Sequence, residues 1–337
     1  MSPTNPSMRW VLVVLLAVFS AACTHVNTRV AVRATPAPTP PPTCPLTGTP
    51  PPGGTVPDRP ALALKVENLP ASRPPTGLKA ADIVYEEPVE EGITRFIVIY
   101  QCRDATVVEP VRSARLVDPD VLAQFGRPLF AYAGGIGPTL DKVRRSNVVD
   151  LSFLYELRGY HRDPSRSAPH NLIGNTADLY ARGGVHGGRP QPIFTYTTAP
   201  DPGGPGSSVH VPFSGYSDVT WQWNPTAHRY ERGYAGVPAL ESDGSRIGAV
   251  NVIVQLVRVT PSPYVEDPTG SHQNYVTVTG TGPVLVCRTG SCVGGTWQRP
   301  TLSSITTYID TAGHQISLSP GPTWIELAPS GTAVTHV

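Results

Sequence analysis

The first 23 residues determine where the rest of the chain folds, and therefore which bonds it can form. Arg9 precedes an apolar run at 10–19, and the small residues 20–22 follow that run. This layout is typical of a secretory signal and is too short and wrongly flanked for an ordinary spanning helix. We therefore expect residues 1–22 to be a signal peptide and the body to fold outside the cytoplasm, where disulfides persist.

Cys23 follows the small residues directly, as in a lipobox, where the cysteine thiol is diacylated and becomes the mature N-terminus. We expect Cys23 to be lipidated and to anchor the chain to the extracytoplasmic face of the cell membrane. Ser20 stands where leucine is commonest, so cleavage after Ala22 with release, or an uncleaved anchor, remain alternatives. Even the apolar run at 247–259 is interrupted by polar residues and falls short of the ~18 residues that a span needs.

The other four cysteines form an even set, as expected for disulfides in an oxidising compartment. Cys287 and Cys292 flank a four-residue turn between strand-like runs, so we expect a bridge across a hairpin. The remaining pair, Cys44 with Cys102, would fasten the end of a Pro-rich segment to a strand. Four free thiols are the alternative. We expect no metal site, because the sequence has no CxxC and no His at ligand spacing from a Cys, and we expect no cofactor.

Proline and glycine make up about a fifth of the 337 residues, with 39 and 32 copies. Eleven of the prolines lie at 36–60, which predicts an extended tether over 23–60 that follows the lipidated cysteine. The pattern changes again near a Pro/Gly stretch at 200–206. We therefore expect an N-terminal domain at 61–200 and a C-terminal domain at 207–337.

The residue patterns predict an α+β fold, with an N-terminal mixed α+β domain followed by a mostly antiparallel β domain. In the first half, the apolar and β-branched runs predict strands, two of them an antiparallel pair, at 61–66, 82–86 and 94–100. Helices are expected at 119–124, 139–145, 150–157 and 176–182. In the second half, short β runs recur every 8–12 residues: 209–212, 219–223, 228–232, 250–259, 275–279, 284–287, 305–310, 315–318 and 323–327.

The charge balance argues against nucleic acid as a partner. The chain has 26 basic and 25 acidic residues, a net charge of +1, and nucleic-acid binding needs a clustered basic surface. Neither GxSxG nor HExxH occurs, so no nucleophile elbow or zinc-protease motif is present.

Glu86 and Glu90 are the weak candidates for acid/base chemistry among the carboxylates. Strand alternation with Pro88 between them would place both on similar sides, where they could converge. A charged, solvated strand edge explains them equally well.

Arg112 and Arg115 lie three residues apart and would share a face if the segment turns helically. Two guanidinium groups there would suit a carboxylate or phosphate, and Arg95 and Ser113 are further candidates for binding such a ligand. The alternative is that these arginines pair internally with the acidic cluster just upstream.

The segment at 160–172 gathers His, Asp, Ser and Arg residues on a predicted loop, where scaffolds often present functional groups. His161 and His170 are weak candidates for a base, with Ser113, Ser165 or Ser167 as nucleophile. Further candidates for ligand binding are Arg162, Asp163 and Asn171. A loop histidine is more often a structural hydrogen-bonding residue.

Together these motifs resemble the YerB-like family of bacterial lipoproteins, which have an N-terminal and a C-terminal domain, both of unknown function. In this sequence Glu91 and Glu109 stand where the family pattern has glycine. The resemblance implies a lipoprotein with two domains and implies no reaction. It is carried by residues 45–48, 73–78, 81–86, 92–95, 110–115, 162–163, 168–172, 295–299 and 320–325.

Three functions follow as hypotheses. The first is a tethered protein that binds a cell-wall or other anionic ligand through its Arg and His residues. The second is an envelope hydrolase or transferase that uses carboxylate and His groups. The third is a structural scaffold, which buried and mutually paired Arg and His residues would favour. The sequence leaves open whether the chain is an enzyme, and it identifies no protein partner.

Overall fold

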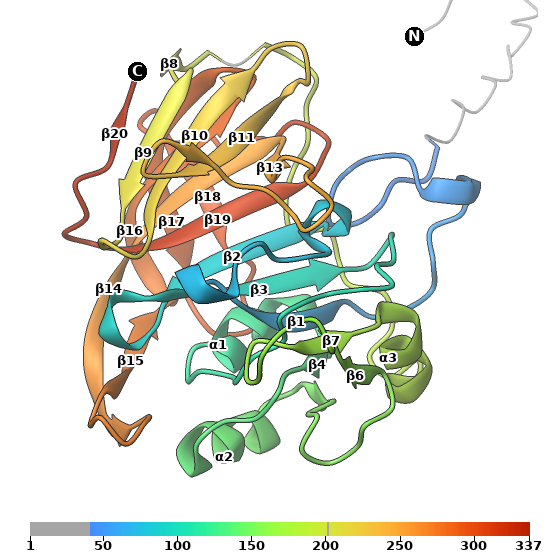
Figure 1. Cartoon of the computed structure of the whole chain (residues 1–337). Helices are drawn as coiled ribbons and strands as arrows, with labels where there is room; N and C mark the ends of the chain where they lie inside the picture. The colour runs from blue at the N-terminus through green and yellow to red at the C-terminus, as the bar shows by residue number, and fades with distance from the viewer. Residues whose placement is uncertain (1–40, 201) are drawn as a thin grey trace, which may run out of the picture. The chain divides into compact units, whose positions relative to one another are not determined.

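One large sheet takes strands from both halves of the sequence (Figure 1). The computed structural model describes residues 41–200 and 202–337, so the predicted signal peptide and Cys23 lie outside the described residues. The twelve strands of this sheet are β1 (Leu62–Glu67), β2 (Ile83–Pro88), β3 (Thr94–Tyr100), β4 (Leu129–Ala131), β5 (Val149–Asp150), β8 (Gly204–Pro205), β14 (Asn251–Val265), β15 (His272–Thr277), β16 (Gly280–Arg288), β17 (Ser291–Arg299), β18 (Thr307–Asp310) and β19 (Thr323–Pro329).

The order of these strands shows how the two halves join. The main path is β18-β17-β16-β14-β19-β2-β3-β1-β4-β5, with β15 paired to β14 and β8 to β17. Strand β19 is parallel both to β14 and to β2. The sheet thus continues across the Pro/Gly stretch, and residues 41–337 form one compact unit. The domain boundary at 200–207 stays a prediction.

A second sheet belongs to the C-terminal half and is antiparallel in all its pairings. Its strands are β9 (Ser208–Pro212), β10 (Asp218–Asn224), β11 (Arg229–Tyr234), β12 (Val237–Pro238), β13 (Gly248–Ala249) and β20 (Thr335–His336). Strands β6 (Tyr160–Arg162) and β7 (Leu172–Gly174) form a separate hairpin. The α+β prediction, with a mainly β C-terminal part, is confirmed.

The twelve-stranded sheet, called the central sheet below, is covered on both faces in its middle strands. Successive side chains of a strand point to opposite sides, so each of these strands contributes to two cores. On one face, Leu64 of β1 and Val98 of β3 share a core with Trp221 of the second sheet. On the other face, Ala63 and Ile97 share a core with the helices. Polar side chains in these strands are therefore buried too, on one face or the other.

The helices are short and lie at the end of the molecule opposite β9–β11 (Figure 1). They are α1 (Asp118–Leu122), α2 (Gly137–Arg145) and α3 (Thr176–Gly183), with 3₁₀ turns η1 (Pro52–Gly54), η2 (Pro70–Ser72), η3 (Leu78–Ala80), η4 (Glu90–Gly92) and η5 (Ala123–Phe125). Asn175 caps α3 by accepting the backbone N–H groups of Ala177 and Asp178. Three of the four predicted helices are present.

Two expectations about secondary structure were wrong, and strand β17 was not predicted. Residues 150–157 form no helix: Leu154, Tyr155 and Leu157 are exposed, so no apolar stripe is buried there. Residues 315–318 make only isolated bridges. Strand β17 was missed because Gly294 and Gly295 interrupt its β pattern, although Gly295 is required there: a Cβ would lie 2.1 Å from the carbonyl oxygen of Ile309 on β18.

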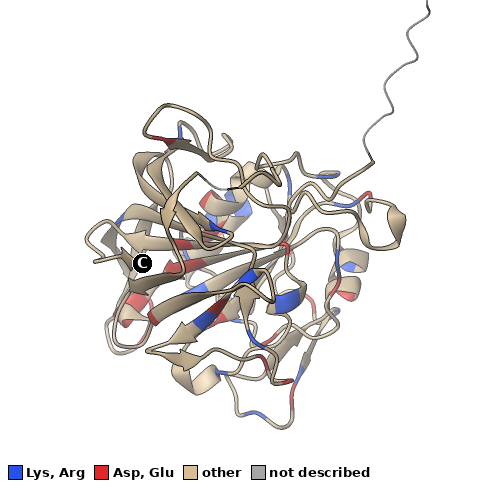
Figure 2. Cartoon of the chain, turned by 90° about the horizontal axis from the view of Figure 1, so that it is seen from above, with Lys and Arg blue, Asp and Glu red and all other residues tan. Residues whose placement is uncertain are grey.

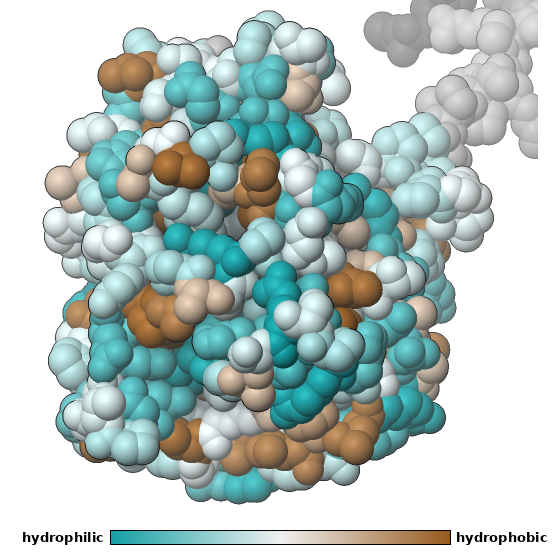
Figure 3. Space-filling model, in the orientation of Figure 1, coloured by the Kyte–Doolittle hydropathy of each residue, from teal (hydrophilic) through white to brown (hydrophobic). Residues whose placement is uncertain are grey.

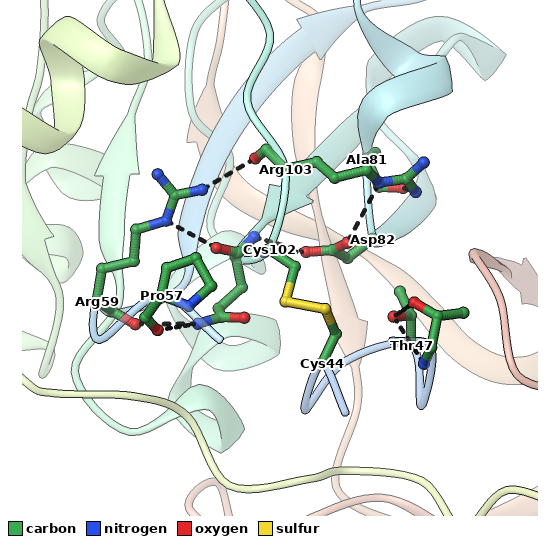
Figure 4. The surroundings of a disulfide bond; sticks show 10 residues. Cys44, Thr47, Pro57, Arg59, Ala81, Asp82, Cys102 and Arg103 are labelled. Atoms are coloured by element: carbon green, nitrogen blue, oxygen red, sulfur yellow. Dashed lines mark hydrogen bonds and ion pairs between the residues drawn. A yellow bond between two sulfur atoms is a disulfide. The ribbon is translucent and has the colours of Figure 1, made fainter. Parts of the chain in front are cut away.

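Both predicted disulfides, Cys44–Cys102 and Cys287–Cys292, are present. Beside the first, the Asp82 carboxylate accepts backbone N–H groups of Gln101 and Cys102 at 2.6 and 3.0 Å (Figure 4). Leu46, just beyond Cys44, is fully buried. The end of the Pro-rich segment is therefore fastened to the body by packing as well as by the disulfide.

Apolar residues on the face seen in Figure 3 lie in separate patches between polar ones. Within the described residues, no helix has the length and apolar character to cross a membrane.

Candidate functional site

Backbone pairing brings the arginine segment beside strand β1. The N–H of Arg112 donates to the carbonyl of Lys65 at 2.9 Å, and the N–H of Glu67 donates to the carbonyl of Pro110 at 3.0 Å. On its other side, the N–H of Val111 donates to the carbonyl of Leu172 on β7. The residues before β7, including His170, are thereby placed near the same end of β1.

Glu67 connects Arg112 and His170. Its carboxylate is buried, and one oxygen accepts Arg112 Nε at 3.0 Å while the other accepts His170 Nδ1 at 2.7 Å. The arginine and histidine side chains are 22% and 24% exposed. In the described part of the chain, the outer nitrogens, Arg112 Nη1 and Nη2 and His170 Nε2, have no hydrogen-bond partner. We call these three residues the Glu67 cluster.

Arg95 and Arg115 converge beside this cluster but are occupied internally. Their Nη1 atoms both donate to the carbonyl of Ser113, at 2.9 and 3.4 Å. Arg115 Nε also donates to Glu90 at 2.7 Å, and its Nη1 lies 3.0 Å from Glu266. Burial, and next the charge of Arg115, lower the pKa of Arg95 to about 10. These two arginines are thus closely packed cations with the buried Glu90 and the half-buried Glu266 as partners, as the internal-pairing alternative expects.

Ser113 lies between Arg112 and Arg115 and is half-buried. Its carbonyl is occupied by the two arginines, while its hydroxyl has no hydrogen-bond partner within the described residues. The hydroxyl is therefore the second polar group, after Arg112, that this segment leaves available.

Glu86 does not share its partners with Glu90. It lies on the opposite face of β2 from Glu87, where Arg232 of β11 pairs with it. Asn68 Nδ2 and the Thr94 hydroxyl also donate to its Oε1 atom, at 3.1 and 2.6 Å. Glu86 and Arg232 are both fully buried, so this pair joins the two sheets and has no access to solvent.

An aromatic cage surrounds Arg232. The rings of Tyr234, Trp324, Phe96 and Trp221 have centroids 4.3, 5.2, 5.5 and 5.8 Å from its guanidinium carbon. Their faces attract the cation, which offsets the lack of hydrogen-bond partners at Arg232 Nε and Nη1. A second carboxylate, Glu326, lies directly beside Glu86 across the β19–β2 pairing. Burial, and next the charge of Glu86, raise the pKa of Glu326 well above its usual value, favouring its protonated form.

On the other face of the sheet, Lys65 lies between Glu87 and Asp118, and all three are fully buried. Asp118 is 2.7 Å from Lys65 Nζ and also accepts the N–H of Arg115 at 2.7 Å. Burial, and next the charge of Asp118, raise the pKa of Glu87 to about 8. Figure 2 shows acidic and basic residues on the central strands, and those named here, Lys65, Glu86, Glu87 and Glu326, are fully buried.

The other predicted residues belong to the β6–β7 hairpin: His161 and Arg162 lie on β6, and Asp163 and Asn171 lie in the loop between the two strands. Arg162 Nη1 donates to Asn171 at 2.6 Å, and Asp163 accepts the N–H and hydroxyl of Ser165 at 2.8 and 2.7 Å. The hydrogen bond with the Ser165 hydroxyl, followed by that with its N–H, lowers the pKa of Asp163. His161 is exposed. These contacts shape the loop, and they do not join the Glu67 cluster.

Sequence reasoning missed the carboxylate that organises the site. Glu67 is part of an apolar strand, and no local pattern links it to positions 112 and 170. Arg232, Glu326 and Lys65 were missed for the same reason. Within residues 41–200 and 202–337, no three His, Cys, Asp or Glu side chains group as they would around a metal ion.

Comparisons with known proteins place the chain in a family. Residues 46–187 match the N-terminal domain, and residues 209–325 the C-terminal domain, of the protein of unknown function DUF3048. The chain is 27% identical over 297 residues to "Putative lipoprotein YerB" of Bacillus subtilis (strain 168), covering 85% of this chain and 86% of that protein.

The crystal structure of the YerB protein from Bacillus subtilis has the same fold, with a TM-score of 0.74 at 22% identity. The match covers 87% of this chain and 99% of that one. The expected family resemblance is confirmed, and the chain belongs to the DUF3048 family, whose two domains are of unknown function.

Proposed function

We propose that the chain is a membrane-tethered, extracytoplasmic lipoprotein whose body binds an anionic ligand of the cell envelope at the Glu67 cluster. The name of the Bacillus subtilis relative supports the lipoprotein part, together with the signal-like segment and Cys23. The ligand would contact Arg112 Nη1 and Nη2, the Ser113 hydroxyl and His170 Nε2.

One observation carries the proposal: a single buried carboxylate fixes an arginine and a histidine and leaves their outer nitrogens unpartnered. A guanidinium held through Nε presents its two Nη groups as a fork that matches a carboxylate or phosphate. Because Nδ1 of His170 donates to Glu67, Nε2 accepts a hydrogen bond when the ring is neutral and donates one to an anion when it is protonated.

The test is cosedimentation of the purified protein with purified cell wall, with inorganic phosphate as a competing anion. We expect Arg112→Ala to weaken binding by about tenfold, because it removes a charge-assisted hydrogen-bonding group. Arg258→Ala is the matched control, since it removes an exposed arginine on β14, which is distant in sequence from all three residues of the Glu67 cluster. Unchanged binding by folded Arg112→Ala, or an equal loss in Arg258→Ala, would contradict the proposal.

An envelope hydrolase is the second candidate, and the His170–Glu67 pair favours it. A carboxylate that holds Nδ1–H keeps Nε2 available as a general base. The protein would then be incubated with purified cell wall, and soluble fragments would be followed by mass spectrometry. Fragments that disappear with His170→Gln would establish catalysis. Their absence with the unmodified protein would leave binding as the function of the cluster.

A further inference from the structure

A groove separate from the Glu67 cluster lies between residues 70–75 and 234–244. One wall comes from the connection between β1 and β2 and the other from the segment that follows β11. Its volume is about 650 Å³, within the range of roughly 300–1,000 Å³ found for ligand pockets. The apolar lining is formed by Pro70, Pro74, Pro75, Val237, Pro238 and Leu240.

Four of these six residues are prolines, which have no backbone N–H group. The proline positions therefore offer an extended peptide no backbone donors for strand addition, which makes β-augmentation unfavourable along these walls. Apolar contact and the few polar side chains present are the interactions that the groove offers most readily.

Arg73 is the cation of the groove, and the surrounding residues hold it in place. Its Nε donates to the Asn68 side chain at 3.1 Å, and its Nη2 donates to the carbonyls of Asn68 and Tyr216 at 2.9 Å each. The guanidinium carbon lies 3.5 Å from the centre of the Tyr234 ring. Nη1 is left without a partner within the described residues.

The charge of Arg73 is not neutralised locally. No carboxylate in the described part of the chain forms an ion pair with it, since nearby Glu86 is paired with Arg232. The one carboxylate lining the groove, Glu241, is occupied by the backbone N–H groups of Lys79 and Gly77, at 2.6 and 3.2 Å. The groove therefore combines apolar walls with the Arg73 cation, which has no ion-pair partner among the described residues, and with the Glu241 carboxylate, whose oxygens accept backbone N–H groups.

Hydrogen bonds between the walls fix the width of the groove. Ser242 of one wall donates its N–H to the carbonyl of Pro75 at 3.0 Å and lies 2.9 Å from the Thr76 hydroxyl. Arg166 reaches both walls, with bonds to the carbonyl of Ser72 at 3.0 Å and to the Ser242 hydroxyl at 3.1 Å. The site is preformed, so little ordering cost opposes binding.

We propose that this groove binds an anionic amphiphile, with the acidic group on Arg73 Nη1 and the apolar chain against the proline-rich walls. The charge complements Arg73, and a flexible hydrocarbon chain needs no backbone donors from the walls.

The test is titration of the purified protein with dodecyl phosphate below its critical micelle concentration, followed by calorimetry and native mass spectrometry. We expect one molecule bound per chain. Arg73→Ala should weaken this binding at least tenfold, whereas Arg258→Ala should leave it unchanged. If Arg73→Ala fails to fold, Leu240→Asp provides the same test, because Leu240 is an exposed lining residue.

Four other probes separate the alternatives. Dodecyl maltoside and dodecyltrimethylammonium carry the same chain without the negative charge, and inorganic phosphate carries the charge without the chain. A peptide of residues 36–60 tests the chain's own Pro-rich segment as occupant. Binding of any of these four as tightly as dodecyl phosphate would overturn the proposal, as would unchanged binding by folded Arg73→Ala. Arg112→Ala should not affect this groove, so the two proposed sites can fail independently.

Discussion

The two faces of the central sheet each bury one cation between two carboxyl groups. Arg232 has Glu86 and Glu326 on the face toward the second sheet, and Lys65 has Glu87 and Asp118 on the helix side. In each set, burial and the charge of the neighbouring carboxylate raise the pKa of one carboxyl group, Glu326 or Glu87, and favour its protonated form.

The two faces differ in the other groups that contact the buried charges. Aromatic rings surround the arginine, and an arginine does not lose its proton in proteins. On the helix side, Asp118 also accepts a backbone N–H, and burial together with the charge of Asp118 raises the pKa of Glu87. The arginine set therefore depends on its carboxylates more strictly than the lysine set does.

The largest effect should come from removing both carboxylates of Arg232. In Glu86→Gln/Glu326→Gln the buried guanidinium loses the carboxylate that pairs with it, Glu86, and stays charged, which should lower the free energy of unfolding by about 3–5 kcal/mol. Urea denaturation measures this. Adding Arg232→Met should recover much of the loss, and no recovery would mean that packing rather than charge sets the cost.

The lysine set should make the free energy of unfolding depend on pH, because Glu87 has a raised pKa. Glu87 binds its proton more tightly in the folded state, so its contribution is complete below its unfolded pKa near 4.5 and is lost as the pH rises through about 8. We expect the free energy of unfolding to fall by about 2–3 kcal/mol between pH 5 and pH 7. Glu87→Gln should flatten the curve, whereas an unchanged slope would assign the effect to other groups.

The smallest effect should come from the Glu67 cluster, which lies on the helix-side face but reaches solvent. Arg112→Ala leaves Glu67 paired with His170 and should cost at most about 1 kcal/mol of stability. Thermal and urea denaturation against Arg258→Ala would check this. A loss comparable to that of the Arg232 carboxylates would make Arg112 a structural residue and remove it from the proposed binding site.

Local pattern predicted much of the fold, because strand alternation and helix caps depend on neighbours in the sequence. Strands β2 and β3, and helix α3, arise where their residues predict them. Strand β17 could not be predicted from local pattern. Its Gly295 is required by the close approach of β18, a contact with another strand that the local sequence does not reveal.

The candidate site was less predictable because its members meet only through long-range pairing. Arg95, Arg112, Ser113 and Arg115 were named as candidates from the sequence, but Glu67 and Arg73 were not singled out. Their roles depend on the register of β1 against residues 110–112 and on a wall supplied by residues 234–244. Glu91 illustrates the reverse case: it stands where the family pattern has glycine, and its φ of 57° keeps the left-handed conformation that glycine favours.

The position of β19 has a consequence for the order of events during biogenesis. Residues 323–329 occupy the middle of the central sheet, between strands that begin at residues 83 and 251. Pairing across such a sequence distance is slow to form, and β2 has no neighbour on that side until residue 329 has been synthesised. We therefore expect the growing chain to stay incompletely folded throughout synthesis and to depend on protection from aggregation and proteolysis until its final strands are complete.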